Sequence, residues 1–267
     1  MSPLPPPPRR LTASGVRLAA AALVAAFATA SPVVIEAARA QTSIQAPGAA
    51  SSPKRIADGV WFFEGAREHF SRANGGDIVN TGFIETADGA VVIDSGPSLR
   101  YGKAQREKIR EVTGRDVRRV YITHAHPDHF LGNQAYEDVP VEALAPTVRV
   151  IQRDGETLTQ NLYLLVGGAM SGTIPRAPSP LTGLGPGGAA SAGTSPRLGD
   201  ATTVEIGGRK LRLIALAGHT AAHLAVFDEQ TRPLFAGDLV FFERAPTTPN
   251  ADLDVWLAAL AQLQALP

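Results

Sequence analysis

A cluster of metal-ligand side chains is the feature that most restricts how this chain can fold. Three of its six histidines and one aspartate lie within residues 124–129. A proline follows His126 and favours an extended backbone there, so His124 and His126 project to the same side of the chain. Both can then reach one ion at about 2.0–2.1 Å, the usual zinc–imidazole distance. After the proline the chain turns, and Asp128 and His129 can reach a second ion.

The residues that precede this cluster predict where it lies. Residues 117–123 form a short run rich in β-branched side chains, as expected for a strand covered on both faces. Ligands of open α/β sheets bind at the carboxyl ends of the strands. We therefore expect an α/β fold with a metal site at the end of a buried strand. The alternative is a polar turn that happens to be rich in histidine, although only three histidines occur elsewhere.

Charge and cysteine content narrow the possible partners. The chain has 25 basic and 25 acidic residues and no cysteine. A net charge of zero provides no electrostatic surface for nucleic acid or for an anionic membrane. Without cysteine there are no disulfides and no thiolate ligands, so a metal must be held by His, Asp or Glu. These observations favour a small-molecule substrate.

The N-terminus has the pattern of an export signal. Arg9 and Arg10 precede an apolar, Ala-rich run, residues 18–30, that is too short for a transmembrane helix. A small-x-small pattern at residues 38–40 then predicts cleavage before Gln41. The two arginines resemble a twin-arginine signal, but the residues after them match it poorly, so the Sec and twin-arginine routes both stay open. We expect a signal peptide over residues 1–40 and a periplasmic or secreted protein without a membrane anchor after cleavage. A disordered, Ala-rich tail is the alternative.

The first half of the mature chain alternates strand and helix patterns. Residues 41–53 are predicted to be a flexible lead, and residues 54–267 to be the folded domain. The Asp-Gly pair at residues 88–89 is typical of a hairpin turn. Gly114 marks the end of an amphipathic helix. The predicted strands are 60–63, 78–85, 90–94 and 117–123, and the predicted helix is 101–112.

The second half carries a long segment of unusual composition. Residues 171–199 are rich in Gly, Pro and Ser and are predicted to be a mobile flap near the site, with a domain linker as the alternative. A final helix, residues 252–266, has an apolar stripe predicted to face the core. That stripe consists of Leu253, Trp256, Leu257, Leu260 and Leu263. The other predicted elements are a helix at 148–165 and strands at 202–206, 210–216, 222–227 and 233–236.

Further candidate site residues follow the ends of predicted strands. His219 and Asp238 each come just after a strand and directly after a glycine, where the backbone can approach closely. Asp94, which ends a strand, is expected either to orient a ligand histidine or to form a turn. His223 is expected to support the site without binding metal. His69 is expected at the surface or at the rim of the cleft.

In this order, the motifs resemble those of the metallo-β-lactamase-fold hydrolases. That family has a strand ending in Asp, then His-x-His-x-Asp-His, then Gly-His-Thr, then Gly-Asp. The corresponding residues are Asp94, His124, His126, Asp128, His129, His219 and Asp238. Three further segments, residues 80–84, 129–133 and 225–229, resemble the quinoprotein relay system zinc metallohydrolases. Those are exported proteins linked to quinoprotein dehydrogenases, which makes such a dehydrogenase system a candidate partner.

The resemblance implies an αββα sandwich with a dinuclear zinc site between the sheets. One zinc ion would be held by His124, His126 and His219, and the other by Asp128 and His129. Asp238 would bridge the two ions. A zinc-bound water ionised near neutral pH would then attack the substrate carbonyl, with Asp128 as the catalytic residue that positions it.

The sequence departs from the family pattern in two ways. Many β-lactamases have a cysteine ligand, and here Asp238 resembles the bridging aspartate of thioesterase-type members instead. The final family histidine, in a Pro-Gly-His-Gly turn, does not occur before the chain ends at Pro267. We therefore expect a sandwich that lacks its C-terminal strand and helix, with one or two zinc ions and an incomplete second site.

Three functions stay open at this point. The first is a zinc hydrolase acting on an ester, thioester, lactone or amide. The second is a non-catalytic periplasmic metal-binding accessory protein. The third is a mononuclear iron enzyme of the persulfide dioxygenase type, favoured if two histidines and one carboxylate leave open positions on the ion. Flavodiiron oxidoreductases are disfavoured, because they carry Glu where His126 stands.

Overall fold

A computed structural model describes residues 48–184 and 199–267. The predicted signal peptide, residues 41–47 of the predicted lead and residues 185–198 of the Gly/Pro/Ser-rich segment lie outside the described residues. Within those residues, no helix combines the length and apolar character that crossing a membrane requires.

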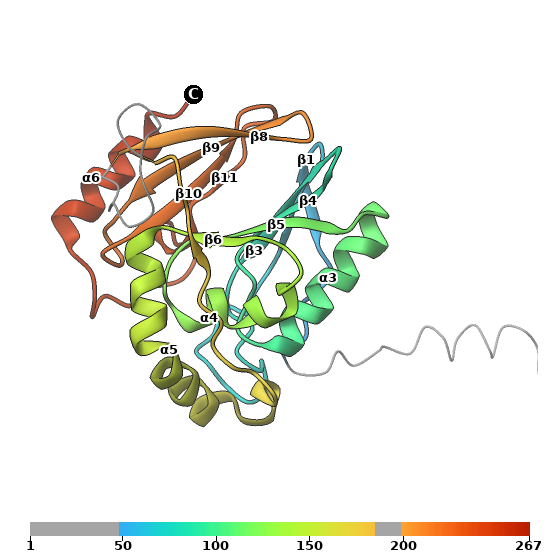
Figure 1. The fold of residues 1–267 in the computed structure, drawn as a ribbon. Coiled ribbons are helices and arrows are strands. Elements are labelled where there is room, and N and C mark those ends of the chain that lie inside the picture. The colour runs from blue at the N-terminus through green and yellow to red at the C-terminus, as the bar shows by residue number, and fades with distance from the viewer. Residues whose placement is uncertain (1–47, 185–198) are drawn as a thin grey trace, which may run out of the picture. The chain divides into compact units, whose positions relative to one another are not determined.

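The described strands form two sheets that share one core (Figure 1). The larger sheet has the order β1-β2-β3-β4-β5-β6-β7 and the smaller β11-β10-β9-β8. Strands β1 to β4 pair antiparallel, β4 to β7 pair parallel, and the smaller sheet is antiparallel throughout. The bounds are β1 Lys54–Ala57, β2 Val60–Phe63, β3 Thr81–Thr86, β4 Gly89–Ile93, β5 Val117–Ile122, β6 Val141–Ala143, β7 Ser179–Pro180, β8 Ala201–Ile206, β9 Arg209–Leu216, β10 His223–Asp228 and β11 Leu234–Phe235.

Helices cover the outer faces of both sheets, which gives the predicted αββα layers (Figure 1). Helices α3 and α5 pack on the larger sheet around Phe83 and Val120, and α6 packs on the smaller sheet. Between the sheets, side chains of alternating residues such as Val91 and Leu213 interdigitate. The helices are α3 Leu99–Thr113, α4 Pro127–Phe130, α5 Ala145–Val166 and α6 Leu253–Gln264, with 3-10 turns η1 Leu131–Tyr136, η2 Gly167–Met170 and η4 Gly237–Leu239.

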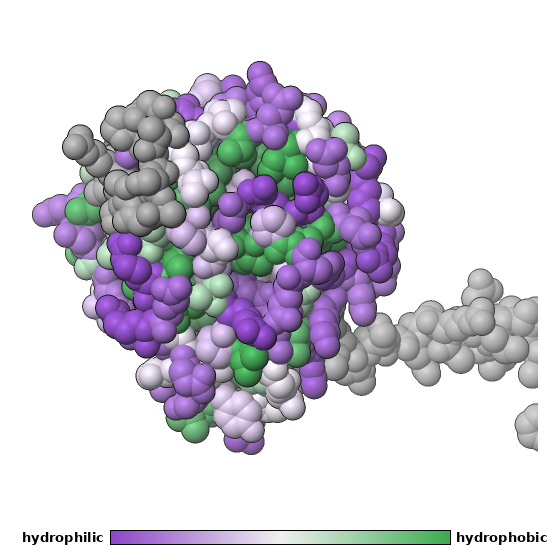
Figure 2. Space-filling model, in the orientation of Figure 1, coloured by the Kyte–Doolittle hydropathy of each residue, from purple (hydrophilic) through white to green (hydrophobic). Residues whose placement is uncertain are grey.

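Burial of the apolar residues in these layers leaves a mainly polar exterior. The face drawn in Figure 2 is largely hydrophilic, with hydrophobic residues in small scattered patches.

Ser98 caps the start of α3, where its hydroxyl accepts from the Tyr101 N–H, and Gly114 ends the helix with a φ of 67°. A hairpin turn at residues 87–88 joins β3 to β4, and Gly89 of the predicted Asp-Gly pair begins β4.

Two sequence predictions about the fold were wrong. Leu253 and Leu257 are not part of the buried stripe of α6, since they are 62% and 66% exposed. The rotation of the helix is set by Trp256, whose indole N–H donates to the Leu239 carbonyl at 2.9 Å, so the buried side consists of Trp256, Ala259 and Leu263. The segment 171–199 is also not all loop, because Ser179–Pro180 adds a short strand to the larger sheet.

Candidate metal centre

The site lies where β4 and β5 end. These strands are parallel, so their carboxyl ends meet at one edge of the larger sheet. Asp94 follows β4 with a φ of 63°, a left-handed conformation that Asp tolerates better than most residues. Thr123 and His124 follow β5. The left-handed turn directs the Asp94 carboxylate at Thr123, whose backbone N–H donates to Asp94 Oδ1 at 2.7 Å.

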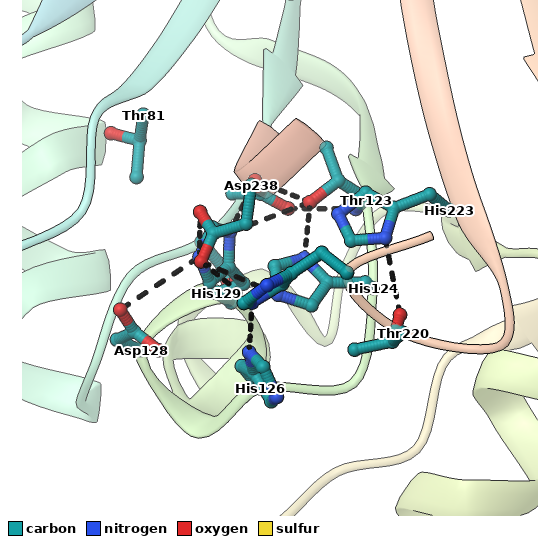
Figure 3. Close-up of polar contacts among 12 residues, drawn as sticks. Thr81, Thr123, His124, His126, Asp128, His129, Thr220, His223 and Asp238 are labelled. Carbon is teal, nitrogen blue, oxygen red and sulfur yellow. Dashed lines mark hydrogen bonds and ion pairs between the residues drawn. The ribbon is translucent and has the colours of Figure 1, made fainter. Parts of the chain in front are cut away.

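A first set of ligand atoms comes from both sheets (Figure 3). His124, His126, His219 and Asp238 each place one ligand atom within 4.8 Å of the others. His219 Nε2 lies 3.1 Å from His126 Nδ1 and 3.3 Å from Asp238 Oδ2, and His124 Nε2 lies 3.8 Å from the same oxygen. Three imidazoles and one carboxylate in this space are a donor set typical of zinc.

A second set adjoins the first through the other oxygen of Asp238. His129 Nε2 lies 3.2 Å from Asp238 Oδ1 and 3.8 Å from Asp128 Oδ2. One oxygen of Asp238 therefore faces His124 and His219 and the other faces His129, which is the placement that a bridging carboxylate needs. Asp238 is held there by Gly237, whose φ of 52° suits glycine and whose missing side chain leaves room for Thr123.

Several ring nitrogens in these sets are buried without a hydrogen bond. Among the described residues, Nε2 of His124, Nε2 of His129 and Nδ1 of His219 have no hydrogen-bond partner. His124, His129 and His219 are each no more than 1% exposed. Burying a polar atom unpaired costs on the order of 1–3 kcal/mol. Metal ions in this space would give the two Nε2 atoms the partner that the protein does not, so the residues fit the ions that the motifs imply.

The histidines differ in protonation. Burial lowers the pKa of His124 well below its ordinary value and lowers the pKa of His126 to about 4. Both rings are therefore neutral at pH 7, the state in which imidazole binds metal. For His129, burial lowers the pKa, but the carboxylates of Asp238 and Asp94 more than offset this and raise it well above the ordinary value.

The two aspartates of the site also differ. Burial raises the pKa of Asp128 to about 6. Burial raises the pKa of Asp238 too, but the neighbouring His129 more than offsets it and holds that pKa well below the ordinary value. Asp238 is thus a permanent carboxylate, whereas Asp128 can exchange a proton near neutral pH.

The structure also places the remaining candidate residues. Asp94 Oδ2 lies 2.8 Å from His129 Nδ1, so Asp94 orients that histidine as expected. His223 is buried and stacks on the His124 ring with centroids 4.1 Å apart, while its Nδ1 lies 3.1 Å from Thr220 Oγ1. His223 is outside both donor sets. His69 is exposed and also outside them.

Sequence reasoning missed two contributors to the site. Thr123 connects Asp94 with the histidines, but its identity as a threonine at a strand end gave no signal of this. Phe241 packs its ring 5.5 Å from that of His219, and the chain after it reaches across to the loop before β3. There Arg244 donates to the Ile78 carbonyl at 3.0 Å, and Glu243 pairs with Arg67. Contacts between such distant positions have no periodic pattern in the sequence.

Comparisons with known proteins agree with this arrangement. Two sheets packed between helices, with a His/Asp cluster at the strand ends, define an α/β metal-site protein. The family model of the metallo-beta-lactamase superfamily matches residues 74–267. The chain belongs to the metallo-beta-lactamase superfamily, whose members are mostly hydrolases.

Solved structures show the same fold at low identity. A metallo-beta-lactamase from Pontibacter korlensis is 23% identical with a TM-score of 0.57, and the match covers 79% of this chain and 84% of that one. A metallo-beta-lactamase from Hirschia baltica is 16% identical with a TM-score of 0.58, covering 80% and 84%.

Three curated relatives match at low identity or over a short stretch, and two of them are named for different substrates. A linear primary-alkylsulfatase of Pseudomonas sp. is 22% identical over 68% of this chain and 38% of its own length. A hydroxyacylglutathione hydrolase of Cupriavidus taiwanensis is 41% identical over 32% of this chain and 37% of its own. A beta-lactamase-like protein 2 homolog of Caenorhabditis elegans is 22% identical over 70% of this chain and 52% of its own. The chain spans about two fifths to one half of these relatives.

Proposed function

We propose that this protein is a zinc-dependent hydrolase of a small molecule with an ester, thioester, lactone or amide bond. The observation that carries the proposal is the position of Asp238, one of whose oxygens faces His124 and His219 while the other faces His129. The alkylsulfatase and the hydroxyacylglutathione hydrolase support hydrolysis as the reaction type. They act on different substrates, so they support no narrower choice.

The residues of the site would have the following roles. His124, His126 and His219 would hold one ion, and Asp128 with His129 the other, with Asp238 shared. Bound zinc supplies Lewis acidity that polarises a carbonyl and eases the ionisation of water. Asp128 Oδ2 faces the same space, 3.8 Å from His129 Nε2, and a carboxylate there would position a water molecule and accept its proton. Asp94 keeps His129 turned toward the ion by holding its Nδ1.

The test is metal content combined with turnover. The protein from Gln41 onward is purified from cells, its metals are measured by elemental analysis, and hydrolysis of thioester, ester, lactone and β-lactam substrates is followed. We expect zinc, loss of hydrolysis after chelation, and recovery on adding zinc. Iron instead of zinc would favour the persulfide dioxygenase type, and zinc without any turnover would favour the accessory role.

We also propose that the protein is exported and works beside a quinoprotein dehydrogenase system. The small-x-small pattern before Gln41 and the three segments that resemble the quinoprotein relay hydrolases support this. N-terminal sequencing of the protein recovered from the periplasm should begin at Gln41. Recovery of the chain with Met1 intact contradicts export by cleavage.

A further inference from the structure

One buried hydroxyl lies among the residues that orient both ligand sets. Thr123 is 0% exposed. Its Oγ1 lies 2.9 Å from Asp94 Oδ2, 3.0 Å from His124 Nδ1 and 3.4 Å from His129 Nδ1 (Figure 3). His124 belongs to the first ligand set and His129 to the second, so this hydroxyl contacts a member of each.

The number of protons in this group fixes the direction of each hydrogen bond. The Asp94 carboxylate has only acceptor atoms, so the hydroxyl of Thr123 donates its single proton to Oδ2. The hydroxyl must then accept from His124 Nδ1, which therefore carries the proton. Nε2 of His124 is left with its lone pair, and this is the nitrogen that has no hydrogen-bond partner.

The Asp94 carboxylate also fixes the orientation of the second histidine, His129. Asp94 Oδ2 lies 2.8 Å from His129 Nδ1 and accepts its proton, so the Nε2 of His129 faces the second set. Asp94 itself is held by two bonds from Thr123, one from the backbone N–H at 2.7 Å and one from the hydroxyl. Without the hydroxyl, Asp94 loses one anchor and His124 loses its acceptor.

Thr123 also contacts the smaller sheet. Its carbonyl accepts from the Leu224 N–H of β10 at 2.8 Å. A Cβ added at Gly237 would lie 2.8 Å from Thr123 Oγ1, so the turn that presents Asp238 packs directly on this hydroxyl. Thr123 therefore contacts both β10 and the turn that carries Asp238.

We propose that Thr123 is a positioning residue shared by the two metal positions: its hydroxyl directs Nε2 of His124 at the first position and, by holding Asp94, keeps the His129 ring directed at the second. The inference rests on the proposed metal site. It predicts that loss of the hydroxyl weakens zinc binding at both positions together, whereas loss of a ligand histidine weakens its own position first.

The experiment compares Thr123→Val, which removes the hydroxyl at nearly constant volume, with Thr123→Ser, which keeps it. Zinc affinity is measured by competition with a chromophoric chelator, and the ligand geometry by the visible spectrum of the cobalt(II)-substituted protein. We expect Thr123→Val to weaken zinc binding 10–100-fold and to change the cobalt spectrum, the range seen when groups that orient metal ligands are removed. Thr123→Ser should stay within about threefold of the wild type, by the same reasoning.

Thr159→Val is the matched control. Thr159 is also a buried threonine, and its hydroxyl donates to the Gly155 carbonyl at 2.7 Å within α5, away from both ligand sets. This variant should bind zinc as the wild type does. If Thr123→Val binds zinc and cobalt as Thr159→Val does, the inference is wrong.

A second measurement needs no substitution. In the metal-free wild-type protein, nitrogen NMR of the imidazole rings should find the proton of neutral His124 on Nδ1. A proton on Nε2 overturns the inference, even if Thr123→Val does not fold. If the wild-type protein binds no metal at all, the proposed function fails, but the NMR result still decides the orientation of His124.

Discussion

The two ends of the β9–β10 hairpin bury ionisable groups in opposite ways. At the far end, Arg209 and Asp228 are 7% and 0% exposed. Arg209 donates from Nε and Nη2 to the two Asp228 oxygens at 3.0 and 2.7 Å, and from Nη2 to the Asp58 carbonyl. At the site end, His219 and His223 are equally buried, but one ring nitrogen of each has no hydrogen-bond partner among the described residues.

This difference separates a structural cluster from a functional one. The far end also has an open cavity of about 520 Å³, lined by Arg55, Asp58 and Arg209 among others. Arg55 pairs with Asp58 there, and Arg209 pairs with Asp228. These two ion pairs are satisfied within the protein, so they indicate little about a ligand. Buried atoms without partners cost free energy, and at the site end several of them are gathered beside Asp128 and Asp238, which fits a ligand bound there.

The largest expected effect is the loss of metal at the site end. Replacing both His124 and His126 by Ala removes two of three imidazoles from the first set, so we expect zinc affinity to fall more than about a thousandfold, since removing groups that only orient ligands costs about 10–100-fold. Hydrolysis should disappear with it. Elemental analysis after gel filtration measures the metal. The control is His69→Ala, which removes an exposed histidine outside both sets. Unchanged zinc in the double variant contradicts the site.

The second effect concerns the far end of the β9–β10 hairpin, where we expect a change in the free energy of unfolding alone. Arg209→Met leaves the Asp228 carboxylate buried and unpaired, which costs about 3–5 kcal/mol of unfolding free energy. Chemical denaturation of the metal-free protein measures this. Adding Asp228→Leu to Arg209→Met should recover most of the loss, because no buried charge is then left. A fall in zinc affinity in a folded Arg209→Met protein would mean that the two ends are not independent.

The third effect concerns the orientation of ligands. Asp94→Asn keeps the shape of the side chain and tolerates the left-handed φ of 63°. It replaces the carboxylate that holds His129 by a neutral amide, so zinc affinity should fall about 10–100-fold. The metal-free protein should also lose stability, because a buried carboxylate that Thr123 and His129 hydrogen-bond is removed. Chelator competition and denaturation measure the two quantities. An unchanged affinity would show that Asp94 is only a turn residue.

The smallest effect concerns Asp77, a further side chain with a buried, unpaired oxygen. Burial raises its pKa from 3.8 to about 7. Between pH 3.8 and pH 7 the Asp77 carboxyl holds a proton in the folded state that it has released in the unfolded state. The stabilisation that comes from this proton is therefore full below pH 3.8 and is lost as the pH rises through about 7.

Asp77→Asn removes that titration. We expect the variant to be more stable than the wild type at pH 8, on the order of 1–2 kcal/mol after allowing for partial solvent access, and to show no gain at pH 4. Denaturation at both pH values tests this. An equal effect at pH 4 and pH 8 would assign it to the amide rather than to the charge.

Much of this arrangement could be predicted from the sequence, because its signals are local. Alternation and turn residues located β3, β4, β8 and β9, and ligands at strand ends followed from where those strands stop. The edge strand Lys54–Ala57 was missed, since its residues are mostly exposed and only backbone pairing holds it. The rotation of α6 was also missed, because one hydrogen bond from Trp256 decides it.

The parts of the site that could not be predicted depend on contacts between distant residues. Nothing in the identity of Thr123 indicates that its hydroxyl lies between two histidines, because this requires β4, β5 and the turn at Gly237 to meet. The Arg209–Asp228 pair likewise joins the start of one strand to the end of the next. Such contacts depend on how the folded chain packs, and no periodic pattern in the sequence indicates them.

The origin of the ligands in two sheets has a consequence for the unfolded chain. His126 and His219 are 93 positions apart, so an ion bound to both would close a loop of that length. In a chain without cysteine, this ion would act as a reversible cross-link. The chain-entropy relation for a disulfide closing such a loop gives about 4.6 kcal/mol. The concentration of free zinc in the surroundings would then set how often the sheets separate, and with it the lifetime of the protein against proteases.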